Sequence, residues 1–258
     1  MPLKSVFRTR LSAALIAPAL LGAMVACDTA TDPGPPAGVV FVLNSAPSFT
    51  SAQLRVNQTP AGNPINFWGV DQYQVTEDPT GPHTFSLRNG SDTTSIATQI
   101  VNVHRDSVYL FVATQHEGGG SLLLYKNNIP AFDTTMASVR IVNAAQAIGT
   151  VGVVPVGAPI DVYVLGPTAD INTATPNSTN IAYESASPRF TFTPPTGSSD
   201  SVRVVVTLTG SKTALVTRKY GVARVQGDMF RGSVATIVLL NNRNNKALPA
   251  ELFTVTGL

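Results

Sequence analysis

The strongest constraint on the fold is an internal repeat of short apolar runs. Residues 40–46 (VFVLNSA) and 139–145 (VRIVNAA) each open a copy with a strand-like run that ends in Asn and small residues. Four further pairs follow in the same order: 53–56 with 160–164, 67–73 with 182–187, 85–91 with 206–211, and 108–112 with 234–238. Because the order of all five elements is preserved, we predict two copies of one module.

The repeated runs have the character of β-strands. In residues 202–208 (VRVVVTL) the even-numbered positions are apolar and the odd-numbered ones include Arg203 and Thr207, as in a strand with one solvent-facing side. The 20 Gly and 19 Pro residues supply turns, and the runs are spaced by roughly 8 to 15 residues, which is typical of sandwiches. The predicted class is all-β, with two tandem immunoglobulin-like or transthyretin-like β-sandwich modules at 39–130 and 137–258.

The N-terminal residues 1–26 have the layout of an export signal. Lys4, Arg8 and Arg10 form a positive region, and residues 11–25 are uncharged and mostly apolar. This stretch is shorter than the roughly 20 residues that a transmembrane helix requires. We therefore expect the segment to be removed after export.

The segment ends in residues 24–27 (MVAC), which resemble the lipobox of bacterial lipoproteins, where a cysteine becomes the lipidated first residue. Cys27 is the only cysteine, which excludes an internal disulfide and a cysteine-based metal cage. Each buried methylene of an acyl chain such as palmitate contributes about 0.8 kcal/mol of membrane affinity. We predict lipid attachment at Cys27 and a location in the cell envelope, exposed to the periplasm or cell surface, with inner or outer membrane left open.

Residues 27–38 are polar and rich in Pro and Gly, and are predicted to be a flexible tether. Without residues 1–26 the chain holds 14 basic and 15 acidic residues, a balance of −1. A nearly neutral protein has no global electrostatic attraction for nucleic acid, so no nucleic-acid partner is expected.

The second copy also carries a family resemblance. Residues 139–144 (VRIVNA), 158–164 (APIDVYV) and 181–185 (IAYES) resemble the hallmark strands of the bacterial domain-of-unknown-function family 4397. The first copy is similar but has residues 52–57 (AQLRVN) in place of the second run. The resemblance implies an exported or surface-attached protein, and it brings no established catalytic residues.

The catalytic and metal-binding patterns in the sequence are incomplete. His83, His104 and His116 all lie in the first copy without metal-ligand spacing, and we interpret them as turn or loop residues. Residues 170–175 begin like a calcium loop but lack the later oxygen ligands. The carboxylates of Glu77, Asp78, Asp92 and Glu117 could pair only if the fold brings them together. No cofactor and no enzymatic activity are predicted.

Surface contacts offer two candidate sites. Arg218 and Lys219 lie in the more basic second copy and could meet anionic glycans or lipid headgroups. Trp68 and Tyr73 could stack on a sugar, although a lone Trp in a small sandwich is usually a core residue. The leading hypothesis is a non-catalytic structural or interaction module that contacts an envelope protein or a glycan. A carbohydrate-binding adhesive lipoprotein and a secreted hydrolase that uses His116 are the alternatives.

Overall fold

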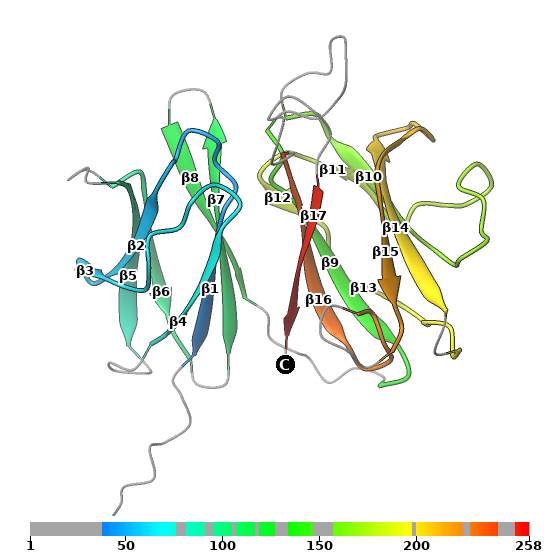
Figure 1. Ribbon diagram of the computed structural model, residues 1–258, viewed down its shortest axis with the longest axis horizontal. Coiled ribbons are helices and arrows are strands. Elements are labelled where there is room, and N and C mark those ends of the chain that lie inside the picture. The colour runs from blue at the N-terminus through cyan, green and yellow to red at the C-terminus, as the bar shows by residue number, and fades with distance from the viewer. Residues whose placement is uncertain are drawn as a thin grey trace, which may run out of the picture. The chain divides into compact units, whose positions relative to one another are not determined.

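All described secondary structure in the computed structural model is β-strand, so the predicted all-β class is confirmed (Figure 1). The structure describes residues 38–75, 81–90, 95–104, 107–116, 119–126, 134–146, 157–197, 200–223, 228–241 and 251–257. No helix in these ranges has the length and apolar character to cross a membrane. The signal segment, Cys27, Glu77, Asp78, Asp92 and Glu117 lie outside the described residues.

Eight strands form the first module, drawn from blue to green in Figure 1. They are β1 (Val39–Asn44), β2 (Ala52–Val56), β3 (Thr59–Pro60), β4 (Val70–Gln74), β5 (Pro82–Asn89), β6 (Ala97–Asn102), β7 (Val108–His116) and β8 (Gly119–Lys126). One sheet has the order β4-β1-β7-β8 and contains the parallel pair β1–β7, and we call it the first mixed sheet. The other, β3-β2-β5-β6, is antiparallel.

Nine strands form the second module, drawn from green to red. They are β9 (Ala137–Asn143), β10 (Ile160–Leu165), β11 (Ser178–Ile181), β12 (Ser185–Ala186), β13 (Phe190–Phe192), β14 (Ser201–Leu208), β15 (Ala214–Gly221), β16 (Val234–Leu240) and β17 (Glu251–Gly257). The second mixed sheet, β12-β9-β16-β17, contains the parallel pair β9–β16, and β13 also pairs with β9. The antiparallel sheet has the order β11-β10-β14-β15. The strand order of the first module is therefore repeated.

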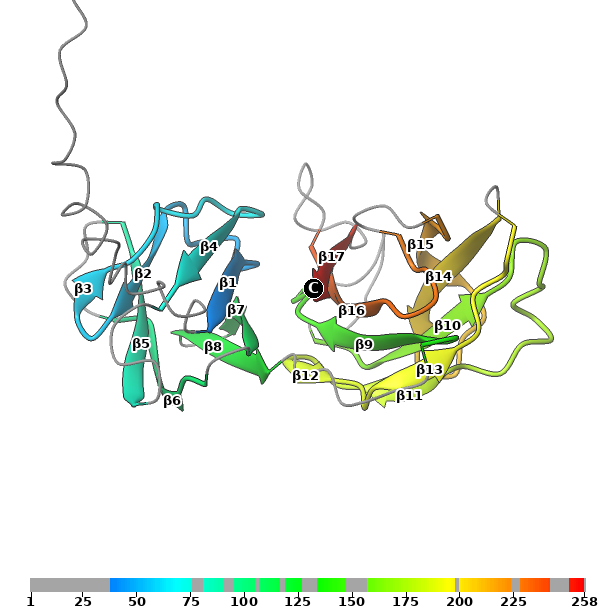
Figure 2. The same cartoon turned by 90° about the horizontal axis from the view of Figure 1, so that it is seen from below.

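Each module is a two-layer sandwich with its own core (Figure 2). In the first, Val42, Phe85 and Phe111 bring together side chains of both sheets, and the rings of Phe85 and Phe111 lie 4.8 Å apart. In the second, Ile141 and Ile237 meet Val204 in the same way. The tandem sandwich architecture follows from these two cores, because each sheet buries one apolar face against its partner.

The outer face of β14 differs from the prediction of a solvent-facing side. Val202, Val204 and Val206 face the core as expected, but Val205 and Thr207 are also buried. Val205 packs with Tyr163 and Leu165 in a small cluster that Ile171 and Ala174 of the following loop cover. The loop after β10 supplies apolar side chains, and period-2 alternation in β14 alone could not reveal them.

Candidate functional site

A third apolar cluster joins the two modules, and we call the contact that it forms the joint. Leu43, Leu110 and Val112 come from the first mixed sheet, Val142, Val238 and Leu240 from the second, and Ala144 directly follows β9; all seven are at most 1 % exposed. These side chains alternate with the core residues along their strands, so they cover the opposite face of each mixed sheet. Residues 36–258 accordingly form one compact unit.

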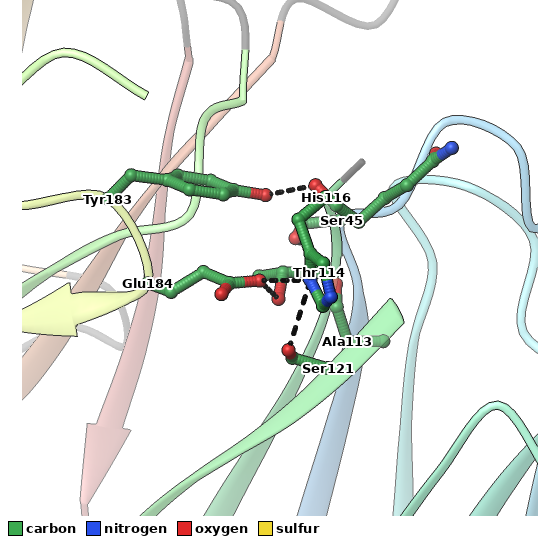
Figure 3. A network of polar contacts seen from close by, with 8 residues as sticks. Ser45, Ala113, Thr114, His116, Ser121, Tyr183 and Glu184 are labelled. Carbon is green, nitrogen blue, oxygen red and sulfur yellow. Dashed lines mark hydrogen bonds and ion pairs between the residues drawn. The ribbon is translucent and has the colours of Figure 1, made fainter. Parts of the chain in front are cut away.

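Polar side chains gather at one side of the joint (Figure 3). Thr114 donates its hydroxyl proton to Oε1 of Glu184 at 2.5 Å, and Nδ1 of His116 lies 3.4 Å from the same oxygen. The phenol of Tyr183 donates to the backbone carbonyl of Gln115. Thr114, Gln115 and His116 end β7 of the first module, whereas Tyr183 and Glu184 occupy the turn between β11 and β12 of the second. The network therefore links the modules.

Ser121, His116 and Glu184 are the residue types of a hydrolase relay, but their geometry differs from one. Ser121 Oγ lies 3.3 Å from Nδ1 of His116, the nitrogen that Glu184 also approaches. A relay needs the acid on one ring nitrogen and the nucleophile on the other, so that a proton can pass through the ring. Here both oxygens meet a single nitrogen. The arrangement can hold the turn of the second module against β7, and it offers no path from serine to carboxylate.

Burial in the joint shifts the pKa of a nearby tyrosine. Desolvation raises the pKa of Tyr183 to about 12, and the neighbouring Glu184 carboxylate acts in the same direction. The phenol therefore stays protonated at neutral pH and remains a hydrogen-bond donor to Gln115.

An arginine–tyrosine contact also crosses the joint. The guanidinium carbon of Arg140 in β9 lies 5.0 Å from the centre of the Tyr125 ring in β8. Desolvation, with a smaller contribution from nearby Arg189, lowers the pKa of Arg140 to about 10, and desolvation raises the pKa of Tyr125 to about 12. At neutral pH both groups keep their ordinary charge, so a cation faces a neutral aromatic ring.

Trp68 makes a further hydrogen bond across the joint. Its indole Nε1 donates to the backbone carbonyl of Asn241, just beyond β16, at 2.6 Å. The half-buried ring packs against the joint cluster, while Tyr73 packs against the core of the first module. The structure thus gives Trp68 a packing role, and it places the two candidate sugar-stacking aromatics against different clusters.

The candidate basic residues lie on the edge strand β15. Arg218 and Lys219 are both exposed. Arg218 donates to the backbone carbonyl of Leu252, and its guanidinium carbon lies 5.2 Å from the centre of the Tyr220 ring. Arg218 is therefore held against β17 and its neighbouring ring, whereas Lys219 is exposed. A ligand contact at either residue stays a prediction.

Two histidine interpretations change with the structure. His83 is not a surface turn residue: it belongs to β5, is 2 % exposed, and its Nδ1 lies 3.2 Å from Nδ2 of Asn57. The prediction was wrong because β5 begins already at Pro82, which turns the imidazole inward. His116, interpreted as a hairpin-loop residue, lies at the end of β7 in contact with Glu184.

No group of three or more His, Cys, Asp or Glu side chains is placed to hold a metal among the described residues. In the loop that begins like a calcium site, both backbone and side-chain nitrogens of Asn172 donate to Oδ1 of Asp170. That oxygen thus closes a local turn.

Asn44 and Asn143 were not among the predicted site residues, although each follows the apolar part of the opening run of its copy. Both are fully buried. Nδ2 of Asn44 donates to the carbonyl of Ile65, and Nδ2 of Asn143 donates to that of Ile181, each at 3.1 Å. The repeated Asn in the two opening runs was the available signal, because a buried amide at the same place in both copies indicates a structural role.

A family model described as domain of unknown function (DUF4397) matches residues 38–154. The sequence resemblance to family 4397 is confirmed for this part of the chain. The matched residues span the first module, which lacks the Pro-x-Asp-Val-Tyr-Val run, and reach only as far as β9 and the segment after it in the second. That the rest of the second module is also family 4397-like stays a prediction.

Two solved structures are similar over most of their length. A putative adhesin from Bacteroides ovatus has 8 % identity and a TM-score of 0.26, covering 85 % of this chain and 92 % of that one. A putative cell adhesion protein from Bacteroides eggerthii has 7 % identity and a TM-score of 0.21, covering 86 % and 96 %. No curated protein matches the sequence. TM-scores this low do not establish a shared fold.

Proposed function

We propose that this protein is a lipid-anchored lipoprotein of the cell envelope, whose two joined sandwiches act as a non-catalytic structural or interaction unit. The export signal and the lipobox-like residues 24–27 support anchoring through Cys27. A chain held by acyl groups on one thiol, followed by a polar tether, displays its folded part outside the membrane.

The observation that carries the non-catalytic assignment is the chemistry of the joint. His116 is the described histidine that contacts both a serine and a carboxylate, yet Ser121 and Glu184 meet the same ring nitrogen. The groups that could have made a hydrolase instead link one module to the other. A molecule whose reactive side chains connect its modules is suited to present a fixed surface.

Metabolic labelling with an alkyne fatty acid tests the anchor. The wild type should incorporate the label and sediment with membranes, whereas Cys27→Ser should lose the label and leave the membrane fraction. Thr29→Ala, two residues away, is the matched control and should be labelled like the wild type. Label retained by Cys27→Ser, or wild-type protein found unmodified in the cytosol, would overturn the anchoring.

Hydrolysis assays test the second half of the proposal. We expect ester and glycoside substrates to turn over no faster with the wild type than with His116→Ala or Ser121→Ala. Turnover that is present in the wild type and lost in both folded variants would instead establish the hydrolase alternative.

A groove in the first module favours glycan binding as the second candidate function. It has a volume of about 310 Å³ and is lined by Asn63, Pro64, Ile65, Asn66, Phe67, Gly69, Val70 and Asp71. Amide side chains beside an aromatic ring are suited to sugar hydroxyls and ring faces. Binding on a glycan array that Asn66→Ala and Phe67→Ala both abolish would support this function, and an array without wild-type binding would exclude it for the glycans tested.

A further inference from the structure

The two turns that cross the joint are equivalent in backbone structure. In the first module Gly69 donates its N–H to the carbonyl of Asn66, and in the second Ser185 donates to Ala182. The backbone N–H of Trp68 donates to the carbonyl of Asn44, and the backbone N–H of Glu184 donates to that of Asn143, each at 2.8 Å. Position 68 therefore corresponds to position 184.

Both turns hold a bulky or charged residue in the left-handed region of backbone space. The φ angle is 71° at Trp68 and 59° at Glu184. Turns of this kind normally place Gly or Asn there, because a Cβ is strained at positive φ. Such strain persists only where surrounding contacts hold it. In both turns the backbone N–H is held within its own module, and the side-chain hydrogen bonds come from the other module.

The surfaces that receive the turns are equivalent as well. Ser45 donates its N–H to Ala113 in β7, and Ala144 donates to Leu239 in β16. Gln115 therefore corresponds to Asn241, two residues farther along each strand. The carbonyl of Asn241 accepts from Trp68, and that of Gln115 accepts from Tyr183. Each module thus offers an aromatic donor on its turn to the equivalent carbonyl of the other, although Tyr183 lies one residue before the position that corresponds to Trp68. The backbone arrangement resembles that of a twofold-symmetric dimer.

The side chains at this symmetric contact differ between the two modules. Glu184 meets the hydroxyl of Thr114, whereas Trp68 packs on the cluster that contains Leu240, the residue equivalent to Thr114. If two second modules paired, Glu184 would face Leu240, and a carboxylate would lose its donor against an apolar side chain. The Glu184 side chain is 23 % exposed, so the loss is that of a charge-assisted hydrogen bond. The Glu184–Thr114 pair therefore favours the mixed arrangement over pairing of two second modules.

We propose that the joint is an internalised homodimer interface: each module presents a docking surface for a module of this fold, and residues 68, 114, 184 and 240 direct it to the module of the other kind. The partner of each surface is therefore a second copy of the fold, already supplied within the polypeptide. Because the two modules are linked in one chain, the high effective concentration of the linked module favours closure within the molecule over pairing with a neighbour.

Exchanging the two residue pairs tests the proposal in the full-length mature chain carrying Cys27→Ser. Spin labels on Ile100→Cys in β6 and Thr217→Cys in β15, both exposed, report the distance between the modules. Two mismatched variants carry Trp68→Glu or Glu184→Trp alone. The exchanged variant combines Trp68→Glu and Leu240→Thr with Glu184→Trp and Thr114→Leu, so that each pair moves to the equivalent site.

The wild type should give one narrow distance distribution, each mismatched variant a broad one, and the exchanged variant a narrow one at the wild-type distance. Circular dichroism must show folded sheets in all four proteins. A broad distribution in a folded exchanged variant would overturn the equivalence of the two sites. Narrow distributions in both mismatched variants would show that these residues do not direct the pairing. A variant that unfolds is replaced by its milder form, Glu184→Gln or Trp68→Phe, which should broaden the distribution less.

Discussion

The turns at residues 66–69 and 182–185 share one backbone path but have opposite chemistry. Trp68 adds an aromatic ring to an apolar cluster and uses one N–H, whereas Glu184 gathers a hydroxyl and an imidazole around its carboxylate. The comparison shows that a symmetric contact can be held by an apolar anchor on one side and a polar one on the other. The stability of the apolar side should depend on packing, and that of the polar side on paired hydrogen bonds.

The largest effect should follow from placing a charge in the apolar part of the joint. Val238→Asp puts a carboxylate among side chains that exclude water, so the free energy of unfolding should fall by about 3 kcal/mol or more. Urea titration followed by circular dichroism measures this loss. Ile100→Asp, at a position 73 % exposed, is the control and should change stability by no more than about 0.5 kcal/mol. Equal losses for the two variants would contradict burial at the joint.

Removing the apolar anchor should cost less. We expect Trp68→Ala to lower the free energy of unfolding by about 2 kcal/mol, because the half-buried ring and its bond to Asn241 are lost together. Trp68→Gly should be less damaging, since glycine also relieves the strain at φ 71°. Gln58→Gly is the matched control: it relieves a similar strain at φ 69° outside the joint and should be neutral or stabilising. A stabilising Trp68→Gly would show that the strain outweighs the anchor.

The polar anchor is tested by a double-mutant cycle between Glu184 and Thr114. Glu184→Ala and Thr114→Ala should each lower the free energy of unfolding, and the coupling between them should be about 1 kcal/mol, as for a partly exposed charge-assisted hydrogen bond. Thermal or urea unfolding of the four proteins gives this coupling. The same cycle between Glu184 and Ser48, whose backbone N–H donates to Oε1 of Gln115, should give no coupling. Additive effects for Glu184 and Thr114 would show that the two side chains do not stabilise the joint through each other.

The smallest effect concerns alkaline pH. Tyr183 has a raised pKa of about 12 in the folded chain against about 10 when unfolded. Between these values the unfolded state binds fewer protons, so stability falls as the pH rises through this window. Tyr183→Phe removes this contribution, and the decline from pH 10 to 12 should be shallower than in the wild type. An unchanged slope would mean that the phenol ionises freely in the folded protein.

The fold was largely predictable from the sequence because its signals are local. The repeated runs correspond to β1 and β9, β2 and β10, β5 and β14, and β7 and β16, in the same sheet order. The sequence holds one further local signal: residues 108–113 and 234–240 are almost continuously apolar, which indicates strands buried on both faces. Both runs contribute side chains to the joint.

The polar site could not be predicted in the same way. Thr114 and Glu184 are 70 residues apart, and neither belongs to a catalytic or ligand-binding motif. Their contact depends on how two folded sandwiches pack, which no periodicity encodes. Trp68 shows the same limit: its type predicted a packing role, but only the fold shows that its N–H bonds to the other module.

Trp68 is the only tryptophan of the chain, so its fluorescence reports on the joint from the first module alone. Val238→Asp lies in the second module, and it should shift the emission of Trp68 to longer wavelength and increase its quenching by acrylamide, while circular dichroism stays that of folded sheets. Emission and quenching identical to the wild type in a folded Val238→Asp protein would contradict a joint between the modules.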